Sequence, residues 1–222
     1  MGPGQKTKRR MNGDTREWWI VQAGTLKFTI EGQEPITATK GVMVQVPYRT
    51  LYQIENVGTE PALRFEVNIT KARKLYPLDE TPDPLAGFEF IPTRVTGGRG
   101  SYGEGNRVTV DFNKVVAGQE TGGAFVSDDR GYANIILGNY QPPPPATDKG
   151  HFHEEGSEFW LIMLGKIRYR IGDLPVFEAE PGDVVYAPRQ TWHLASNGGE
   201  AGLRSCRLAM NGYPFQAHMY ER

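Results

Sequence analysis

The sequence predicts an all-β protein made of two copies of one small barrel, and three observations support this prediction. The 222 residues include 27 glycines and 16 prolines, a composition that favours many turns between short strands. Polar and apolar residues alternate in many segments, whereas the residue spacing typical of a helix is weak almost everywhere. The second half of the chain also repeats the first.

The repeat is visible when EWWIVQAGTLKFTI, which starts at Glu17, is placed beside EFWLIMLGKIRYRI, which starts at Glu158. At this offset of 141 residues, ten of the 40 positions that start at Glu17 are identical without a gap. Chance rarely keeps glycines and prolines in register over such a distance. We therefore interpret the two halves as copies of one structural unit.

Each copy is predicted to consist of strands. In TLKFTI and KIRYRI every second residue is apolar, so these residues share one face of a strand. The runs GVMVQVP and GDVVYAP are β-rich, and each begins with glycine and ends with proline, as short strands often do. The segments EGQEP and GDLP carry turn residues and separate the strands.

The segment between the two copies is less regular. Residues 69–84 are predicted to form a short helix before a proline-rich connection, and further strands are expected within residues 88–140, most clearly RVTVDF and YANIILGNY. We expect an N-terminal barrel over residues 1–70, a connecting segment over 71–106 and a C-terminal barrel over 107–222.

The two copies are not equally complete. Sixteen residues precede Glu17, whereas roughly sixty residues of strand-forming chain precede Glu158. Either the first barrel lacks its opening strands, or strands from elsewhere in the chain or from a partner fill the gap, because an open sheet edge invites pairing. A homodimer that exchanges strands is one expectation.

Two histidines that lie one residue apart mark a candidate metal site. His151 and His153 point the same way if they lie on a strand, and Glu158 and His193 follow within the same copy. Neutral imidazole is the commonest metal ligand in proteins, and a carboxylate adds charge for a divalent ion. The alternative is that these histidines are ordinary hydrogen-bonded residues of the barrel interior or rim.

This spacing resembles the two motifs of the cupin superfamily. The first is His-x-His, four residues, Glu, six residues and Gly; the second is Gly, five residues, Pro, then His and Asn. Two copies suggest a bicupin, which implies two jelly-roll barrels of the double-stranded β-helix type, the N-terminal one without its first strands. The resemblance implies that one divalent ion binds to four side chains: His151, His153, Glu158 and His193.

The resemblance also assigns turns and shows departures. Gly165 and Gly182 are expected in turns. Pro145 replaces the glycine expected before the first histidine, and Gln190 replaces the small residue expected before His193. Both departures concern loop shape more than coordination.

The first copy has lost the ligands. At the same offset the three histidines are replaced by Arg10, Asn12 and Tyr52, and only Glu17 persists. Arginine stays protonated and cannot ligate a metal, so the first barrel is predicted to be metal-free. It is expected to serve as a scaffold or dimer surface; the alternative is a small-molecule site around Arg10, Glu17 and Tyr52.

Composition excludes several classes of partner. The formal net charge is −1, which argues against a general nucleic-acid binder. No run approaches the 18 or so apolar residues that a membrane span requires, and the first residues lack the apolar stretch of a secretory signal. Cys206 is the only cysteine, which fits a reducing compartment, so we expect a cytoplasmic protein. His218 is interpreted as an ordinary residue, and GRGSYG as a loop and not a dinucleotide site.

A mixed imidazole and carboxylate set suits Fe, Mn, Ni, Zn or Cu. Four protein ligands leave open positions on an octahedral ion, which is typical of a catalytic site with a small-molecule substrate. Glu158 and Tyr169 are the candidate catalytic residues, the first as a ligand that also takes a proton and the second as a phenolic hydrogen-bond donor. The resemblance favours a mononuclear dioxygenase acting on a small oxygenated or aromatic compound. The alternatives are a metal-dependent isomerase, decarboxylase or lyase, or a non-catalytic ligand-binding protein.

Overall fold

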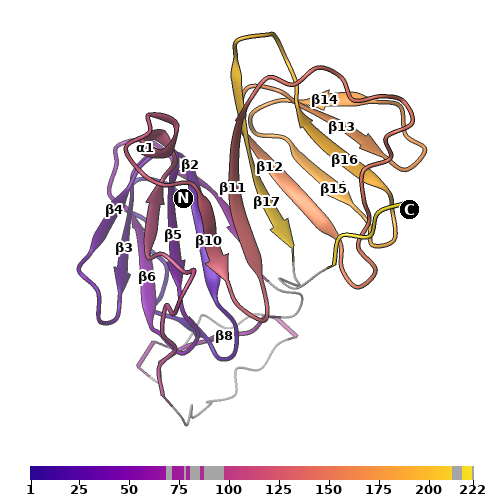
Figure 1. Ribbon diagram of the computed structural model, residues 1–222. Coiled ribbons are helices and arrows are strands. Elements are labelled where there is room, and N and C mark those ends of the chain that lie inside the picture. The colour runs from indigo at the N-terminus through magenta and orange to yellow at the C-terminus, as the bar shows by residue number, and fades with distance from the viewer. Residues whose placement is uncertain (69–71, 78, 81–85, 88–97, 212–216, 222) are drawn as a thin grey trace. The chain divides into compact units, whose positions relative to one another are not determined.

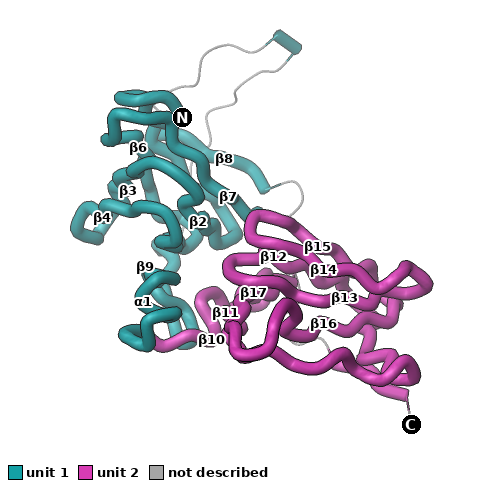
Figure 2. Tube along the Cα trace, turned by 90° about the horizontal axis from the view of Figure 1, so that it is seen from above, with its two compact units in different colours: residues 1–120 teal, residues 121–222 magenta. Residues whose placement is uncertain are grey.

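The computed structural model describes residues 1–68, 72–77, 79–80, 86–87, 98–211 and 217–221. The chain forms two compact units, Met1–Glu120 and Thr121–Arg222 (Figure 2). Every paired strand in both units is antiparallel, which confirms the all-β prediction. The described part of the chain contains no helix with the length and hydrophobicity that a membrane crossing requires.

The first unit holds two sheets and a short strand pair (Figure 1). The four-stranded sheet has the order β7-β2-β5-β9, the three-stranded sheet has the order β4-β3-β6, and β1 pairs with β8. The bounds are β1 Met11–Asn12, β2 Glu17–Ala23, β3 Leu26–Ile30, β4 Ile36–Ala38, β5 Val42–Val46, β6 Tyr52–Asn56, β7 Leu63–Val67, β8 Lys74–Leu75, β9 Thr109–Asp111 and α1 Phe112–Val116.

The second unit repeats this design with a larger sheet. Its five-stranded sheet has the order β10-β11-β17-β12-β15, and its three-stranded sheet has the order β14-β13-β16. The bounds are β10 Gly123–Ser127, β11 Tyr132–Asn139, β12 Glu158–Leu164, β13 Ile167–Ile171, β14 Phe177–Ala179, β15 Val184–Ala187, β16 His193–Asn197 and β17 Arg204–Asn211.

The structure confirms the internal repeat in detail. The strands β2, β3, β4 and β6 start 141 residues before β12, β13, β14 and β16. A register shift occurs between Val21 and Ala23 in the first unit and between Ile162 and Leu164 in the second, again at this offset. The cores also correspond, since Trp19 and Trp160 are both buried at the centre of their barrels.

The turns that precede β6 and β16 have the same backbone conformation and the same hydrogen bond in both units. Arg49 and Gln190 occupy equivalent positions and have positive φ angles of 54° and 59°. The Arg49 amide donates to the Asn12 carbonyl at 2.7 Å, and the Gln190 amide donates to the His153 carbonyl at 2.7 Å. Gln190, which departs from the cupin pattern, therefore ties the turn before β16 to the segment that carries the first two histidines. Gly165 and Gly182 adopt positive φ angles of 63° and 101°, as expected for turns.

The incomplete first barrel is supplemented from within the chain. Strand β9, from Thr109 to Asp111, pairs with β5, and the backbone of residues 4–10 bonds along β6. Among the described strands of the first unit, β7 has no second neighbour, whereas its counterpart β17 pairs with β11. Among the described residues the first barrel has no counterparts of β10 and β11, and a later strand of the same chain covers a different edge.

The region between the two repeats differs in part from the sequence-based expectations. Residues 107–120 were expected in the second barrel, but β9 and α1 belong to the compact unit that ends at Glu120. The expected domain boundaries at residues 70 and 106 stay a prediction. The helix expected over residues 69–84 lies largely outside the described residues; within that range Lys74 and Leu75 form strand β8. Gly98–Gly103 has no helix or strand, as predicted for a loop.

Candidate metal centre

The structure brings the four predicted ligands together inside the second unit. One potential ligand atom from each of His151, His153, Glu158 and His193 lies within 4.8 Å of the others. His153 and His193 are each 1% exposed, and the Glu158 side chain is 12% exposed. The four side chains therefore converge on one largely buried point, and Glu158 and His151 keep some exposed surface.

Three separate segments place these side chains. Glu158 is the first residue of β12, and His193 is the first residue of β16. The backbones of His151 and His193 exchange two hydrogen bonds of 3.1 and 2.8 Å, so the two histidines are direct cross-strand neighbours. Gly150, just before the first ligand, has a φ of +74°, which favours glycine.

The geometry fits a divalent ion. Oε2 of Glu158 lies 3.1 Å from Nε2 of His153 and 3.3 Å from Nε2 of His193. Two ligands at right angles on an ion with bonds of about 2.1 Å lie about 3.0 Å apart, so these separations suit a shared ion. Nε2 of His151 and Nε2 of His193 are buried without a hydrogen-bond partner among the described residues. Buried polar atoms without a partner are costly, and a metal ion would account for both.

The outer ring nitrogens of two ligands are held by backbone carbonyls. Nδ1 of His193 lies 2.9 Å from the Thr191 carbonyl, and Nδ1 of His153 lies 3.1 Å from the Ala217 carbonyl. A carbonyl can only accept, so each Nδ1 carries the proton and each Nε2 faces the centre. This arrangement is the usual support for histidines that ligate a metal.

The pKa values match a site that offers electron pairs to a cation. Burial, together with the nearby His193 and His218, lowers the pKa of His151 to about 4, so this ring is neutral at pH 7. Burial alone would raise the pKa of Glu158, but the neighbouring His153 and His193 outweigh it and lower the pKa to about 2. Burial lowers the pKa of His153, but its bonds to Glu158 and Ala217 outweigh burial and raise it. A proton on His153 can thus offset the buried carboxylate when no ion is bound.

The equivalent place in the first unit is occupied by a lysine. Tyr52 Oη donates to Glu17 Oε2 at 2.5 Å, Asn12 Nδ2 lies 3.3 Å from the same oxygen, and the Lys74 ammonium bonds to Glu17 Oε1. Arg10 Nε donates to Tyr52 Oη at 3.0 Å. Both carboxylate oxygens are therefore satisfied by protein donors, which favours a scaffold over a small-molecule site in this barrel.

Tyr169 lies one layer behind the ligands. It is fully buried, its ring centroid is 5.1 Å from that of Trp160, and the Trp160 ring is 5.5 Å from His193. Its hydroxyl is buried without a hydrogen-bond partner among the described residues, and burial raises its pKa. Tyr169 thus packs against Trp160, which contacts His193, and its catalytic role stays a prediction.

His218 belongs to the site, although the sequence interpretation treated it as ordinary. Its ring stacks on His151 with centroids 4.2 Å apart and lies 4.9 Å from His153. It falls outside the repeated region and outside both motifs. The one signal that could have singled it out is that it is the fourth histidine of a chain whose other three are candidate ligands.

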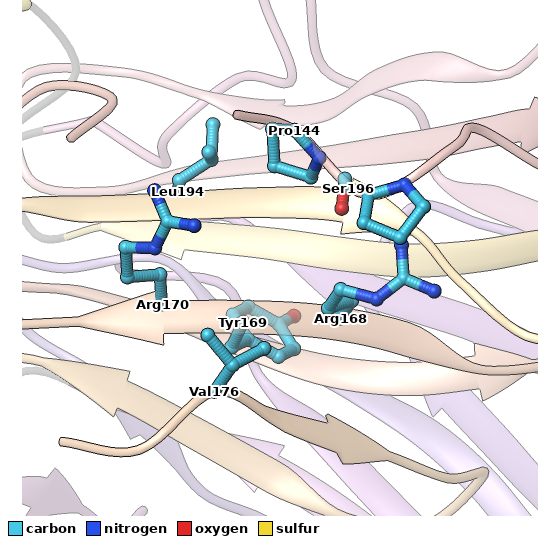
Figure 3. A pocket seen from close by; sticks show the side chains of 8 residues that line it. Pro144, Arg168, Tyr169, Arg170, Val176, Leu194 and Ser196 are labelled. Atoms are coloured by element: carbon cyan, nitrogen blue, oxygen red, sulfur yellow. The ribbon is translucent and has the colours of Figure 1, made fainter. Parts of the chain in front are cut away.

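A small cavity of about 80 Å³ lies elsewhere in the second unit, under the proline run that leads to His151. Figure 3 shows Arg168 and Arg170 on either side of Tyr169, with Pro144 nearby. Arg170 donates to the Pro145 and Ala146 carbonyls at 3.0 and 3.3 Å, which holds the proline run in place. Substrate pockets usually measure about 300 Å³ or more, so this cavity is too small for the predicted substrate.

Comparison with known proteins identifies the family. Residues 1–68 and 140–205 match the family model described as "Cupin domain". These two matches cover more than half of the chain, and the chain therefore belongs to the cupin family. Strand order and the internal repeat fit the double-stranded β-helix barrel expected for each copy. No curated protein sequence matches this chain.

Solved structures share the fold at low sequence identity. A "Cupin 2 conserved barrel domain protein" from Leptotrichia buccalis is 12% identical, with 95% of this chain and 79% of that chain covered and a TM-score of 0.60. Oxalate decarboxylase from Bacillus subtilis is 17% identical, with 99% and 68% covered and a TM-score of 0.54. Another structure of that enzyme, whose title refers to its Mn(II) centres, is 16% identical, with 99% and 68% covered and a TM-score of 0.53. The chain is thus a cupin with a candidate His and Glu metal site.

Proposed function

We propose that this protein is a metal-dependent enzyme acting on a small oxygenated or aromatic compound, with a mononuclear dioxygenase as the first candidate. The observation that supports the proposal is the convergence of four potential ligand atoms within 4.8 Å, three from imidazoles and one from a carboxylate. Four ligands on an octahedral ion leave two positions, as many as a catechol or enol substrate needs to bind through two oxygens.

The bound ion would supply Lewis acidity and lower the pKa of a substrate hydroxyl. The chain supplies the other functions. Oε2 of Glu158 faces His153 and His193, which leaves Oε1 to accept a proton from the substrate. Trp160 is 2% exposed and forms an apolar wall against His193. Apolar walls with a few polar groups are typical of small-ligand pockets.

A decarboxylase acting on a small carboxylic acid is the second candidate. The observation that favours it is the similarity in fold, over 99% of this chain, to oxalate decarboxylase. An isomerase or lyase would use the same ligands, and so would a protein that binds a small molecule without turnover.

Two further expectations stay predictions. The incomplete first barrel predicts a homodimer, which sedimentation at micromolar concentration tests. The second is a cytoplasmic location.

The metal is tested first. Purified protein reconstituted with Mn(II), Fe(II) or Zn(II) should bind one ion per chain. Glu158→Gln removes the only charged ligand and should reduce binding to near zero, because the amide is a poor ligand for a divalent ion. Glu17→Gln changes the equivalent residue of the first unit and should leave one ion per chain. Equal metal content in the two variants would contradict the assignment of the site.

The reaction is tested with the reconstituted protein. Oxygen consumption is measured over a panel of enolic and catecholic compounds, and release of carbon dioxide over small dicarboxylic acids that include oxalate. We expect oxygen uptake with at least one catechol or enol and loss of this uptake in Glu158→Gln. Carbon dioxide release without oxygen uptake would favour the decarboxylase. Tight binding of a compound without any turnover would favour a binding protein.

A further inference from the structure

The last described residues of the chain lie against the metal ligands. We call Ala217–Glu221 the C-terminal strap. Its Met219 exchanges two backbone hydrogen bonds with Phe152, at 3.1 and 2.9 Å. Phe152 is the residue between the two ligand histidines, so the strap pairs directly with the His151–His153 segment. Outside this pairing, Lys149 Nζ lies 2.8 Å from Glu221 Oε1.

The strap holds the ring of His153 by a hydrogen bond. The Ala217 carbonyl accepts from Nδ1 of His153 at 3.1 Å. The corresponding support of His193 comes from Thr191, two residues away in its own segment. For His153 the support comes from a residue 64 positions further along the chain. Loss of the strap would therefore remove the Nδ1 support of His153 but not that of His193.

The strap also packs against the other ligand of the motif. The ring of His218 stacks on His151 at 4.2 Å with an angle of 22° between the planes, and the Tyr220 ring lies 5.6 Å from His151. Among the described residues no hydrogen bond to a ring nitrogen of His151 is present. Ring packing, to which His218 contributes the shortest contact, therefore sets the orientation of this ligand.

We propose that the C-terminal strap is part of the metal centre, where it positions His151 and His153 for coordination. This inference rests on the metal site of the proposed function. His218 acts here as a positioning residue, since its stacked ring lies parallel to a ligand and not at the common point of the four ligand atoms. Because positioning and binding are reciprocal, a bound ion should in turn stabilise the docked strap.

The experiment compares Zn²⁺ affinity, measured by competition with a chromophoric chelator, in the full chain and in a variant that lacks residues 217–222. Supporting contacts of ligand histidines contribute about 10- to 100-fold to metal affinity, and we expect a loss in this range with an unchanged far-ultraviolet circular dichroism spectrum. Equal affinity of the two proteins would overturn the proposal. Failure of the full chain to bind Zn²⁺ would instead overturn the proposed metal site.

Point variants separate the contributions. His218→Ala removes the stacked ring and should weaken Zn²⁺ binding, whereas His218→Phe keeps an aromatic ring and should restore most of the affinity. Glu180→Gln removes one charge from the exposed ion pair with Lys166, outside the strap, and serves as the matched control. Unchanged affinity in His218→Ala, or loss in His218→Phe equal to that in His218→Ala, would contradict a positioning role for the ring.

Amide hydrogen exchange provides a readout that does not depend on mutation. The Met219 amide donates to the Phe152 carbonyl and should exchange more slowly when Zn²⁺ is added to the full chain. The peptide around Gly202, in a turn away from the strap, should show no such change. Equal exchange of Met219 with and without Zn²⁺ would show that the strap and the ion are not coupled.

Discussion

At the scale of single residues, the two units show how one buried carboxylate can be neutralised in two ways. Glu158 faces three imidazoles and is suited to a metal ion, whereas Glu17 bonds to the Lys74 ammonium. A buried carboxylate without a counter-charge is costly, so the loss of the histidines in the first unit requires another cation. Lys74 supplies this charge from strand β8.

This role of Lys74 leads to a prediction about stability. Lys74→Met keeps the length of the side chain but leaves Glu17 buried without its cation, which should cost about 3 kcal/mol of the free energy of unfolding. Lys166→Met removes the exposed partner of Glu180 and should cost less than about 1 kcal/mol. Urea denaturation of both variants and the wild type measures the difference, and equal losses would contradict a structural role for Lys74.

The four ligands could be predicted from sequence because their spacing is local to two short motifs. The positions of His218 and Lys74 could not be predicted in this way. Each residue is brought to its site by a segment that lies far from that site in the sequence and belongs to neither motif. Strand β8 brings Lys74 beside β1, and the strap brings His218 beside His151. Contacts of this kind depend on the path of the chain and not on periodicity.

At the scale of elements, the site depends on how closely the segment of His151 approaches strand β16. A Cβ atom placed on Gly150 would overlap the backbone carbonyl of His193, and the φ of +74° adds a further cost for any other residue. Glycine at this position therefore allows the two ligand-bearing segments to pair. The equivalent pairing in the first unit joins Arg10 to Tyr52.

A matched pair of variants tests this approach. Gly150→Ala should separate the segments of His151 and His193 and weaken Zn²⁺ binding by 10-fold or more, the order of magnitude that a misplaced ligand causes. Gly202→Ala carries a similar backbone penalty, with φ of +86°, but a Cβ there meets no atom within 4 Å. It should reduce stability by about 1 kcal/mol without changing Zn²⁺ affinity. Comparable affinities in the two variants would show that the overlap at Gly150 is absorbed elsewhere.

At the level of the complete chain, an open sheet edge of the first unit is covered by residues that follow the first repeat. Strand β9 pairs Thr109 with Val44 and Asp111 with Val42, and Asp111 also caps helix α1. Asn113 Nδ2 donates to the Lys40 carbonyl at 3.0 Å, which fastens the same corner. These contacts cover an edge of β5 that would otherwise be open.

Two fragments test whether this edge matters. A fragment of residues 1–120 contains β9 and α1, and a fragment of residues 1–106 ends before them, while both contain the first repeat and lack the second. We expect the shorter fragment to give less soluble protein and to unfold at lower temperature by circular dichroism, because an exposed edge and apolar β5 residues promote aggregation. Indistinguishable behaviour would show that β9 contributes little to the first unit.

The features that could be predicted from the order of the residues are those that depend on short-range spacing. Alternating residues predicted the strands, the offset of 141 residues predicted two equivalent barrels, and the resemblance of the motifs to those of the cupins implied the four ligands. Long-range backbone pairing sets which distant segments reach each barrel: β9 at the edge of β5, Lys74 beside Glu17, and the C-terminal strap beside His151. These placements follow from backbone pairing between segments far apart in the chain. Such pairing could not be predicted from sequence, because it produces no periodic pattern of residues.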